Sequence, residues 1–391
     1  MARSRTLEQH IAVFGESGSG KTVLLSSFFG ATQEPQYVRE SLYHVVADQQ
    51  SQGTALMRNY LGMRDGGQAP MATRFTSTSY PFTLRLKDAG TRRSKERPFD
   101  ALRLVWHDYP GEWFEQDASG PEEAARRVDT FRALLGSDVA LLLVDGQRLI
   151  DNAGQEERYL RSLFTNFRNG LLSMKNELLV KGKPLVRFPR IWILALSKAD
   201  LMPQTDVYAF RDLVLGKAGE DVIELRNVIA GLIEGKDALS VGEDFMLLSS
   251  AKFDPDRIEV HRRIGVELVL PIASTLPLER HVRWAQMQQS SGRVAENLVR
   301  SAGGLGDVVG AITGVLSKVP LPGRLGMAKR LAVSVISGKA IKRLADLSGD
   351  KLAQINAQAL AKRDYLTAVL TSFRMGLDRG EAERVLLRSR R

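Results

Sequence analysis

Short apolar runs alternate with helix-type patterns through most of the first 280 residues. Apolar runs predict strands at about 10–14, 139–144, 191–196 and 245–248, and polar loop residues follow each run before apolar side chains recur at helical spacing. Such alternation is typical of an α/β fold in which crossover helices cover both faces of a mostly parallel sheet. We therefore expect that architecture here.

Two other apolar runs predict a different connection. The runs YPFTLRLKD (80–88) and DALRLVWH (100–107) are joined by a polar, basic segment, which predicts an antiparallel hairpin at one edge of the sheet. Residues 31–78, with an amphipathic segment around Ser41–Leu61, are expected to be an insertion, as is 147–189, which contains a charged helix. We place the whole α/β domain at residues 1–279.

The remainder, 280–391, has a helical pattern and a basic charge. It contains 20 Lys and Arg against 8 Asp and Glu, whereas the rest of the chain has 35 against 37. Helices are expected at about 278–301, 324–346 and 349–376. The Gly-containing basic stretch 303–344 fits two interpretations, an interfacial helix pair on an anionic membrane surface or a helical hairpin packed on the core. We expect no nucleic-acid partner.

The composition excludes several kinds of chemistry. The chain has no cysteine, which excludes disulfides, thiolate catalysis and cysteine-type zinc sites. It has no apolar run of the roughly 18 to 20 residues that would span a bilayer, and no signal-type start. We expect a cytoplasmic protein, with peripheral association at the inner membrane face as an option.

The string IAVFGESGSGKT matches the phosphate-binding pattern G-x-x-x-x-G-K-[ST], between an apolar strand run and a helical VLLSSFF. Glycines let successive backbone N–H groups and the helix N-terminus converge on phosphate oxygens. Lys21 is expected to neutralise the β and γ phosphates, and Thr22 to coordinate Mg²⁺. The predicted nucleotide-binding residues here are Gly15, Glu16, Ser17, Gly18, Ser19, Gly20, Lys21, Thr22 and Val23.

A second element, D-Y-P-G, follows the run at 100–107. Asp108 is expected in the Mg²⁺ shell, and the Gly111 N–H at the γ phosphate. Glu112 follows, where it could accept the proton of the attacking water or simply begin a helix with Trp113 in the core. A switch threonine that reaches Mg²⁺ and the γ phosphate is expected before the hairpin, with Thr76 as first choice and Thr73 as second.

Two short motifs indicate the base. Ser197, Lys198 and Asp200 follow one strand run, and Ser250, Ala251 and Lys252 follow the next. A carboxylate at 200 can accept hydrogen bonds from the guanine N1 and N2 hydrogens, which adenine lacks. Asn or Thr is usual at the position of Ser197, whose hydroxyl offers fewer hydrogen bonds than an amide, so a P-loop ATPase stays open as an alternative.

In this order the motifs resemble those of the TRAFAC-type P-loop GTPases, over about residues 10–255. The strings HDYPGEW (107–113) and TRFTSTS (73–79) are similar to the YcjX-like family of bacterial P-loop proteins. The resemblance implies nucleotide binding with Mg²⁺ in a bacterial cytoplasm.

The hypothesis that follows is a GTP-binding protein that hydrolyses GTP slowly to GDP and phosphate and acts as a switch, stimulated by a protein partner or by self-association. The slow turnover is inferred from the Glu at 112, where Ras-like proteins carry a water-positioning Gln. One alternative from another class is a nucleotide-gated scaffold or membrane-associated interaction protein with little turnover.

Overall fold

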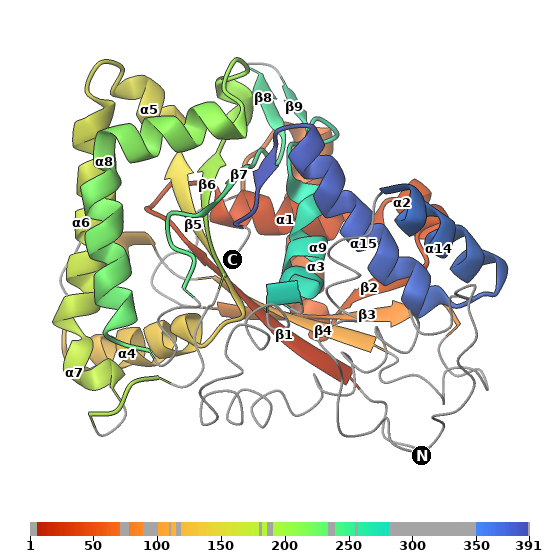
Figure 1. Ribbon diagram of the computed structural model, residues 1–391, viewed down its shortest axis with the longest axis horizontal. Coiled ribbons are helices and arrows are strands. Elements are labelled where there is room, and N and C mark those ends of the chain that lie inside the picture. The colour runs from red at the N-terminus through yellow and green to blue at the C-terminus, as the bar shows by residue number, and fades with distance from the viewer. Residues whose placement is uncertain are drawn as a thin grey trace, which may run out of the picture.

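The computed structural model describes residues 6–70, 78–88, 101–108, 111–114, 119–179, 182–185, 191–233, 239–254, 257–277, 279–280 and 349–389, with backbone alone at 112 and 114. An eight-stranded sheet crosses the molecule in the order β10-β7-β6-β5-β1-β4-β3-β2 (Figure 1). The strands are β1 (Thr6–Phe14), β2 (Tyr43–Ala47), β3 (Thr78–Leu86), β4 (Ala101–Asp108), β5 (Val139–Asp145), β6 (Ile191–Ser197), β7 (Asp244–Leu247) and β10 (Leu386–Leu387).

The centre of the sheet is parallel. Strand β1 pairs with β4 on one side and β5 on the other, and β6 and β7 continue in the same direction. Every residue of β5 and β6 is buried, because helices cover both faces of a parallel sheet, and this explains their continuous apolar runs. The predicted mostly parallel sheet is confirmed.

The end of the sheet from β4 to β2 is antiparallel. Strand β3 pairs with β4 as the predicted hairpin, and β2 pairs outside β3. The segment around Ser41–Leu61, predicted to be amphipathic, contains both β2 and most of α3 (Gln50–Gly66). The β-branched sequence of β2 buries Tyr43 and Val45 alternately, as a strand with one covered face does.

Two hydrophobic cores lie on opposite faces of the sheet (Figure 1). Helices α1 (Lys21–Gln33), α3, α9 (Val269–Ser274) and α15 (Tyr365–Ala382) contribute to the first core. Helices α4 (Pro121–Leu135), α6 (Glu156–Ser173) and α8 (Val207–Ala230) contribute to the second. Aromatic pairs join sheet and helix on each face, with ring centroids 5.5 Å apart for Phe28 and Trp106 and 5.0 Å for Phe14 and Phe167. The predicted helices on both faces are confirmed.

The described C-terminal residues pack on the sheet. The prediction of one helix at 349–376 was wrong, because α14 (Gly349–Ala361) ends before Arg363, whose φ is +53°, and the Asp364 carboxylate caps α15. Phe373 of α15 packs edge-on against Tyr43 of β2, with ring centroids 5.7 Å apart. Strand β10 then pairs antiparallel with β7. The expected helices at 278–301 and 324–346, and the stretch 303–344, lie outside the described residues except for 279 and 280.

A buried ionic network ties this C-terminal end to the sheet. The Asp244 carboxylate at the start of β7 accepts hydrogen bonds from the Arg280 guanidinium at 2.6 Å and from the Ser389 N–H at 2.7 Å. Burial raises the pKa of Asp244, and the positive charge of Arg280 opposes the rise. The last described residues therefore form part of the folded core.

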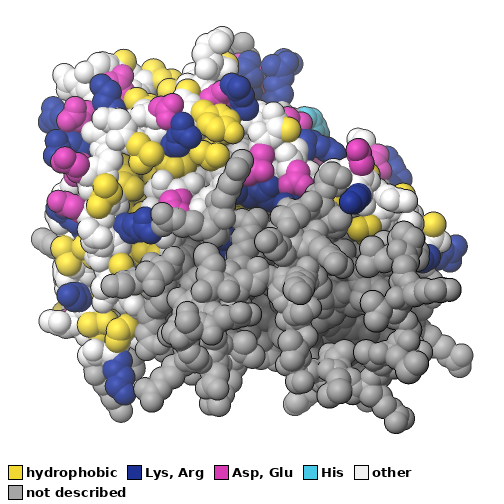
Figure 2. Space-filling model, in the orientation of Figure 1, with side chains coloured by type: hydrophobic (Ala, Val, Ile, Leu, Met, Phe, Trp, Pro, Cys, Tyr) yellow, Lys and Arg dark blue, Asp and Glu magenta, His cyan; other side chains and the backbone are white. Residues whose placement is uncertain are grey.

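The surface of α8 carries exposed apolar side chains. In Figure 2, hydrophobic side chains (yellow) gather at the upper left of the molecule, over α8. Leu215 is 39% exposed and Ile223 is 59% exposed. Among the described helices, none is both long enough and apolar enough to pass through a bilayer.

Candidate functional site

A cavity of about 460 Å³ lies at the carboxyl ends of the parallel strands. Ligands bind α/β sheets at this edge, because the loops that follow neighbouring strands converge there. Its walls come from the loops after β1, β4, β5, β6 and β7 and from the segment after α3. The lining residues include Ser17–Leu24, Ala69, Pro70, Asp108, Gly111, Gln147, Ser197, Lys198, Asp200, Ser249, Ser250, Ala251 and Phe253.

The phosphate-binding loop forms one end of this cavity. Gly18 and Gly20 adopt φ angles of +81° and +92°, a region that side chains disfavour, so the chain can curl before α1 begins at Lys21. A Cβ at Gly15 would lie 2.6 Å from the Ser19 Oγ, which excludes a larger residue there. The loop therefore needs its glycines for shape, and the N-terminus of α1 faces the cavity.

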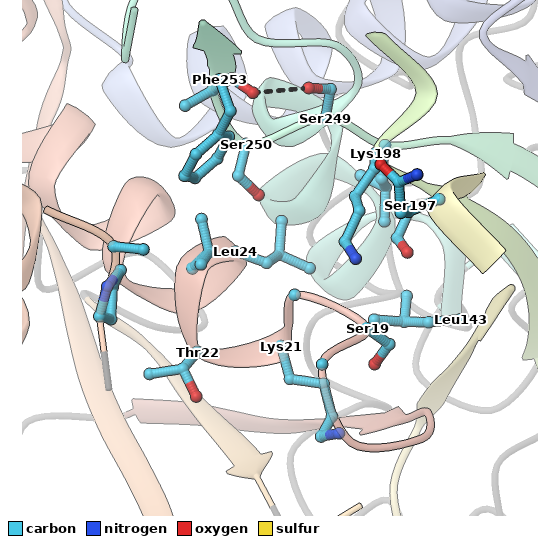
Figure 3. Close-up of a pocket in the computed structure, with 18 of the residues that line it drawn as sticks. Ser19, Lys21, Thr22, Leu24, Leu143, Ser197, Lys198, Ser249, Ser250 and Phe253 are labelled. Carbon is cyan, nitrogen blue, oxygen red and sulfur yellow. Dashed lines mark hydrogen bonds between the residues drawn. The ribbon is translucent and has the colours of Figure 1, made fainter. Parts of the chain in front are cut away.

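Lys21 extends over this loop (Figure 3). Its Nζ donates hydrogen bonds to the carbonyl oxygens of Gly15 at 2.7 Å and Glu16 at 2.9 Å. The side chain is largely buried, and the residue lines the cavity. These bonds hold a positive charge beside the backbone N–H groups of the loop, an arrangement suited to a polyphosphate.

Thr22, Asp108 and Gly111 line the same end of the cavity. Gly111 approaches the phosphate loop so closely that a Cβ would lie 2.3 Å from the Ser17 nitrogen. The Thr22 hydroxyl and the buried Asp108 carboxylate are oxygen donors of the kind that Mg²⁺ prefers. Thr73, Thr76 and the side chain of Glu112 lie outside the described residues.

The other end of the cavity carries Ser197, Lys198 and Asp200 (Figure 3). Lys198 has a φ of +53°, and its Nζ donates to the Asp145 carboxylate at 2.8 Å. The Ser249 Oγ donates to the Asp200 Oδ1 at 2.6 Å, which orients that carboxylate. The Ser197 hydroxyl donates to the Val144 carbonyl at 3.3 Å and so ties its loop to β5.

Ser250 and Ala251 also line this end, whereas Lys252 pairs with Asp254 at 2.8 Å and is not among the described lining residues. Phe253 lines the cavity and is 43% exposed. The predicted base motifs, about 50 residues apart, thus meet at one place. Two residues there were missed, Ser249 and Phe253, and the only sequence signal was their adjacency to Ser250–Lys252.

Sequence reasoning also missed three residues at the end of β5 and directly after it. Gln147 lines the cavity, Asp145 binds Lys198, and Arg148 donates to the Glu16 carboxylate at 2.8 Å. The polar D-G-Q-R string at the end of an apolar strand was the available signal. Ala69 and Pro70, which follow α3, add a wall that the motifs did not predict.

A histidine pair lies behind the phosphate end. The His107 Nε2 is 2.9 Å from the His10 Nδ1, and the Ser79 Oγ is 2.9 Å from the His107 Nδ1. Burial lowers the pKa of His107 to about 4, and the neighbouring His10 adds to the fall. His107 is therefore neutral at physiological pH, next to the Asp108 carboxylate.

Several solved structures match the chain at low identity and low TM-score. A Plasmodium falciparum protein assigned as nucleolar GTP-binding protein 1 is 14% identical, with a TM-score of 0.33 over 77% of this chain and 98% of that chain. The signal recognition particle receptor SRb-GTP/SRX complex from Chaetomium thermophilum is 16% identical, with a TM-score of 0.30 over 62% and 90%. The S. cerevisiae Ski7 GTPase-like domain bound to GTP is 14% identical, with a TM-score of 0.27 over 62% and 42%.

A family model also matches more than half of the chain. No curated protein matches the chain. Residues 9–217 match the Double-GTPase 2 family, and this range includes the phosphate loop, the D-Y-P-G element and the first base motif. The match agrees with the resemblance predicted from HDYPGEW. The chain belongs to the Double-GTPase 2 family, the YcjX-like family of GTP-binding P-loop proteins.

Proposed function

We propose that this protein binds GTP with Mg²⁺ in the cavity, hydrolyses it slowly to GDP and phosphate, and acts as a nucleotide-dependent switch. The observation that carries the proposal is one cavity of about 460 Å³ lined by Lys21 and Thr22 at one end and by Asp200 and Ala251 at the other. Small-molecule sites typically enclose about 300–1,000 Å³, so the cavity has room for a nucleotide along this line.

The phosphate end supplies positive potential and oxygen ligands. In the proposal, the loop N–H groups and Lys21 bind the phosphates, and the hydroxyls of Thr22 and Thr76 with the Asp108 carboxylate hold Mg²⁺. Thr22 and Asp108 fit that ion, since both line the same end and offer hard oxygen donors. Bound there, Mg²⁺ would neutralise the charge on the β and γ phosphates.

The base end favours guanine. A carboxylate has about four lone-pair positions, so Asp200 can accept the Ser249 hydroxyl and both guanine hydrogens. Adenine has neither hydrogen and would leave this carboxylate poorly paired. In the proposal, the Lys198 stem lies along one face of the base, and the Ala251 N–H meets the guanine O6.

Glu112 is proposed to act on the attacking water. Its backbone is held on both sides, because Gly111 touches the phosphate loop and Trp113 is buried in the core. The Arg127 guanidinium also donates to the Trp113 carbonyl at 3.2 Å. These two anchors hold the backbone of residue 112 next to the phosphate loop, which supports the proposed role. Ras-like proteins carry the amide of a Gln at this position to orient the attacking water. Because residue 112 is a Glu, we expect turnover to be slow and to be stimulated by a partner or by self-association.

The segment with Thr76 is proposed as the switch. The chain enters it from Pro70, which lines the cavity, and leaves it at Thr78, whose register partner in β4 is Asp108. One end of the segment thus lies at the cavity wall and the other beside Asp108. A hydroxyl and a carbonyl from this segment would contact Mg²⁺ and the γ phosphate in the triphosphate state only.

Nucleotide binding and turnover test the proposal on the full chain. GTP should bind at least about 100-fold more tightly than ATP, and multiple turnovers should require Mg²⁺. Equal affinity for both bases would contradict the guanine assignment, and tight GTP binding without turnover would favour the scaffold alternative.

The role of Glu112 needs its own variant. Glu112→Ala should lower the GTP turnover rate about 100- to 10,000-fold with little change in GDP affinity, because a positioned proton acceptor typically contributes on this scale. Glu122→Ala, an exposed residue on α4, is the matched control. Unchanged turnover in Glu112→Ala would count against a direct role.

The membrane hypothesis for 303–344 stays a prediction. Co-sedimentation of the full chain with anionic vesicles at low salt tests it, because electrostatic attraction to a lipid surface weakens as salt screens the charges. Absence of binding at low salt would contradict it.

A further inference from the structure

One short turn contacts both ends of the cavity. This β5–α5 turn, Asp145–Arg148, comprises the last residue of β5 and the first residues of α5 (Gly146–Asp151). Arg148 reaches the phosphate loop, Asp145 reaches the base loop, and Gln147, between them in sequence, lines the cavity. Neither Asp145 nor Arg148 is among the described residues that line the cavity, so both act through neighbouring residues.

On the phosphate side, Arg148 neutralises a carboxylate inside the phosphate loop. Its guanidinium donates to the Glu16 Oε2 at 2.8 Å and to the Ser17 carbonyl at 3.2 Å. The Glu16 side chain is only 7% exposed. A buried carboxylate without a counter-charge is costly, and this one would also repel a bound polyphosphate. Burial raises the pKa of the nearby Tyr159 hydroxyl, and the negative charge of Glu16 raises it further.

On the base side, Asp145 holds Lys198. The Asp145 side chain is 3% exposed, and its Oδ2 accepts from the Lys198 Nζ at 2.8 Å while its Oδ1 accepts the Gln147 N–H at 2.9 Å. A Cβ at Gly146 would lie 2.8 Å from the Ser197 carbonyl oxygen, so the turn and the base loop are in direct contact. The Asp145 N–H donates to the Tyr159 hydroxyl at 3.0 Å, which links the two sides.

We propose that the β5–α5 turn positions both ends of the nucleotide site. Arg148 compensates Glu16 so that the phosphate loop accepts an anionic ligand, and Asp145 fixes the Lys198 side chain against the base. The inference rests on the proposed function, since it takes a guanine nucleotide as the ligand of the cavity. It assigns two positioning residues that touch no part of that nucleotide.

Paired probes test each side separately. Dissociation constants of the full chain are measured for GDP, for guanosine as a base-only probe and for pyrophosphate as a phosphate-only probe. Arg148→Gln should lower the affinities for GDP and pyrophosphate by about tenfold or more, within the usual range of coupling between sites, and leave the affinity for guanosine unchanged. Asp145→Asn should lower the affinities for GDP and guanosine by a similar factor and leave the affinity for pyrophosphate unchanged.

A compensating variant distinguishes neutralisation from direct phosphate contact. Removing both charges in Glu16→Gln/Arg148→Gln should return the GDP affinity to within about threefold of wild type, because the role assigned to Arg148 is to offset Glu16. A double variant as weak as Arg148→Gln would mean that Arg148 acts on the phosphates themselves, and it would overturn the proposal. Arg211→Gln, a similarly exposed arginine on α8, is the matched control.

Two further outcomes are decisive. Equal losses for both probes in both variants would indicate a general folding defect and overturn the assignment of separate roles. Wild-type protein that binds none of the three probes would contradict the proposed function itself, whereas normal wild-type binding with unaffected variants would overturn only the role of the turn.

Discussion

The phosphate end and the base end of the cavity are built in different ways. At the phosphate end, one continuous loop, Ser17–Thr22, provides most of the lining, and its shape depends on glycine backbone angles and on the Lys21 bonds to the carbonyls of Gly15 and Glu16. At the base end, side chains from the loops after β6 and β7 meet, and hydrogen bonds such as Ser249 to Asp200 hold them. The first end is local in sequence and the second is assembled by the sheet.

The difference predicts different sensitivities. A backbone site keeps its N–H donors when a side chain is removed, so it should respond mainly to changes in the charges around it. A side-chain site depends on each donor and acceptor, because an unmatched polar group near the base is desolvated without a partner. The following experiments test this contrast.

The largest effect is expected from Lys21→Ala. Loss of its charged hydrogen bonds to the phosphates should weaken GDP binding by about 3–4 kcal/mol, or a few hundredfold, while guanosine affinity is preserved. Isothermal titration with both ligands measures this, with Lys217→Ala on α8 as an exposed control. A parallel loss for guanosine would mean that the two ends do not act independently.

Asp200→Asn should affect only the base end. GDP affinity is expected to fall by about 2–3 kcal/mol because an amide cannot accept two guanine hydrogens, and pyrophosphate affinity should not change. The Asn side chain can instead accept the N1 hydrogen of xanthine and donate to its O2, so xanthosine diphosphate should become the preferred ligand in a competition assay. Retained preference for GDP would remove Asp200 from base recognition.

Phe253→Ala is expected to lower nucleotide affinity by a smaller amount, and equally for different purine bases. Phe253 and Lys198 lie on opposite sides of the cavity in Figure 3, so the ring can stack on the base face away from the lysine stem. Stacking contributes about 1–3 kcal/mol per base, and GDP and inosine diphosphate should weaken by the same factor. Phe253→Trp should bind normally and report binding by fluorescence; normal affinity in Phe253→Ala would exclude the stacking contact.

The smallest expected effect is a loss of folding stability at acid pH, caused by His107 near the phosphate end. The pKa of His107 is about 4 in the folded chain and about 6.5 when unfolded, so the unfolded state binds the extra proton between these values. Stability should therefore fall as pH falls from 7.5 to 5.5, with a His107 contribution of about 1 kcal/mol to the free energy of unfolding. Denaturant titrations at the two pH values measure it.

The control for this prediction is His107→Gln, which has no group that titrates in that window and should lose the His107 part of the pH dependence. Guanosine affinity should stay constant across the same range, because His107 lies beside Asp108 and not beside the base loop. An identical pH dependence in wild type and variant would show that His107 is not the titrating group.

Parts of the fold were predictable because they follow from local patterns. The strand runs, the phosphate loop and the turn after β4 each combine hydrophobic periodicity with glycine or proline at defined positions. Residues 31–78 were not predictable in the same way. The five-residue strand β2 was missed because its pairing with β3, over 30 residues away, decides its conformation more than its own propensity does.

The sequence by itself determined that the chain forms an α/β sheet, that Gly15–Thr22 is a phosphate loop, and that two later motifs follow buried strands. Only the tertiary structure decided which side chains support them. Glu16 meets Arg148, Lys198 meets Asp145 and Asp200 meets Ser249, across separations of 132, 53 and 49 residues. No local spacing encodes such pairs, because the parallel sheet brings the ends of distant strands to one edge.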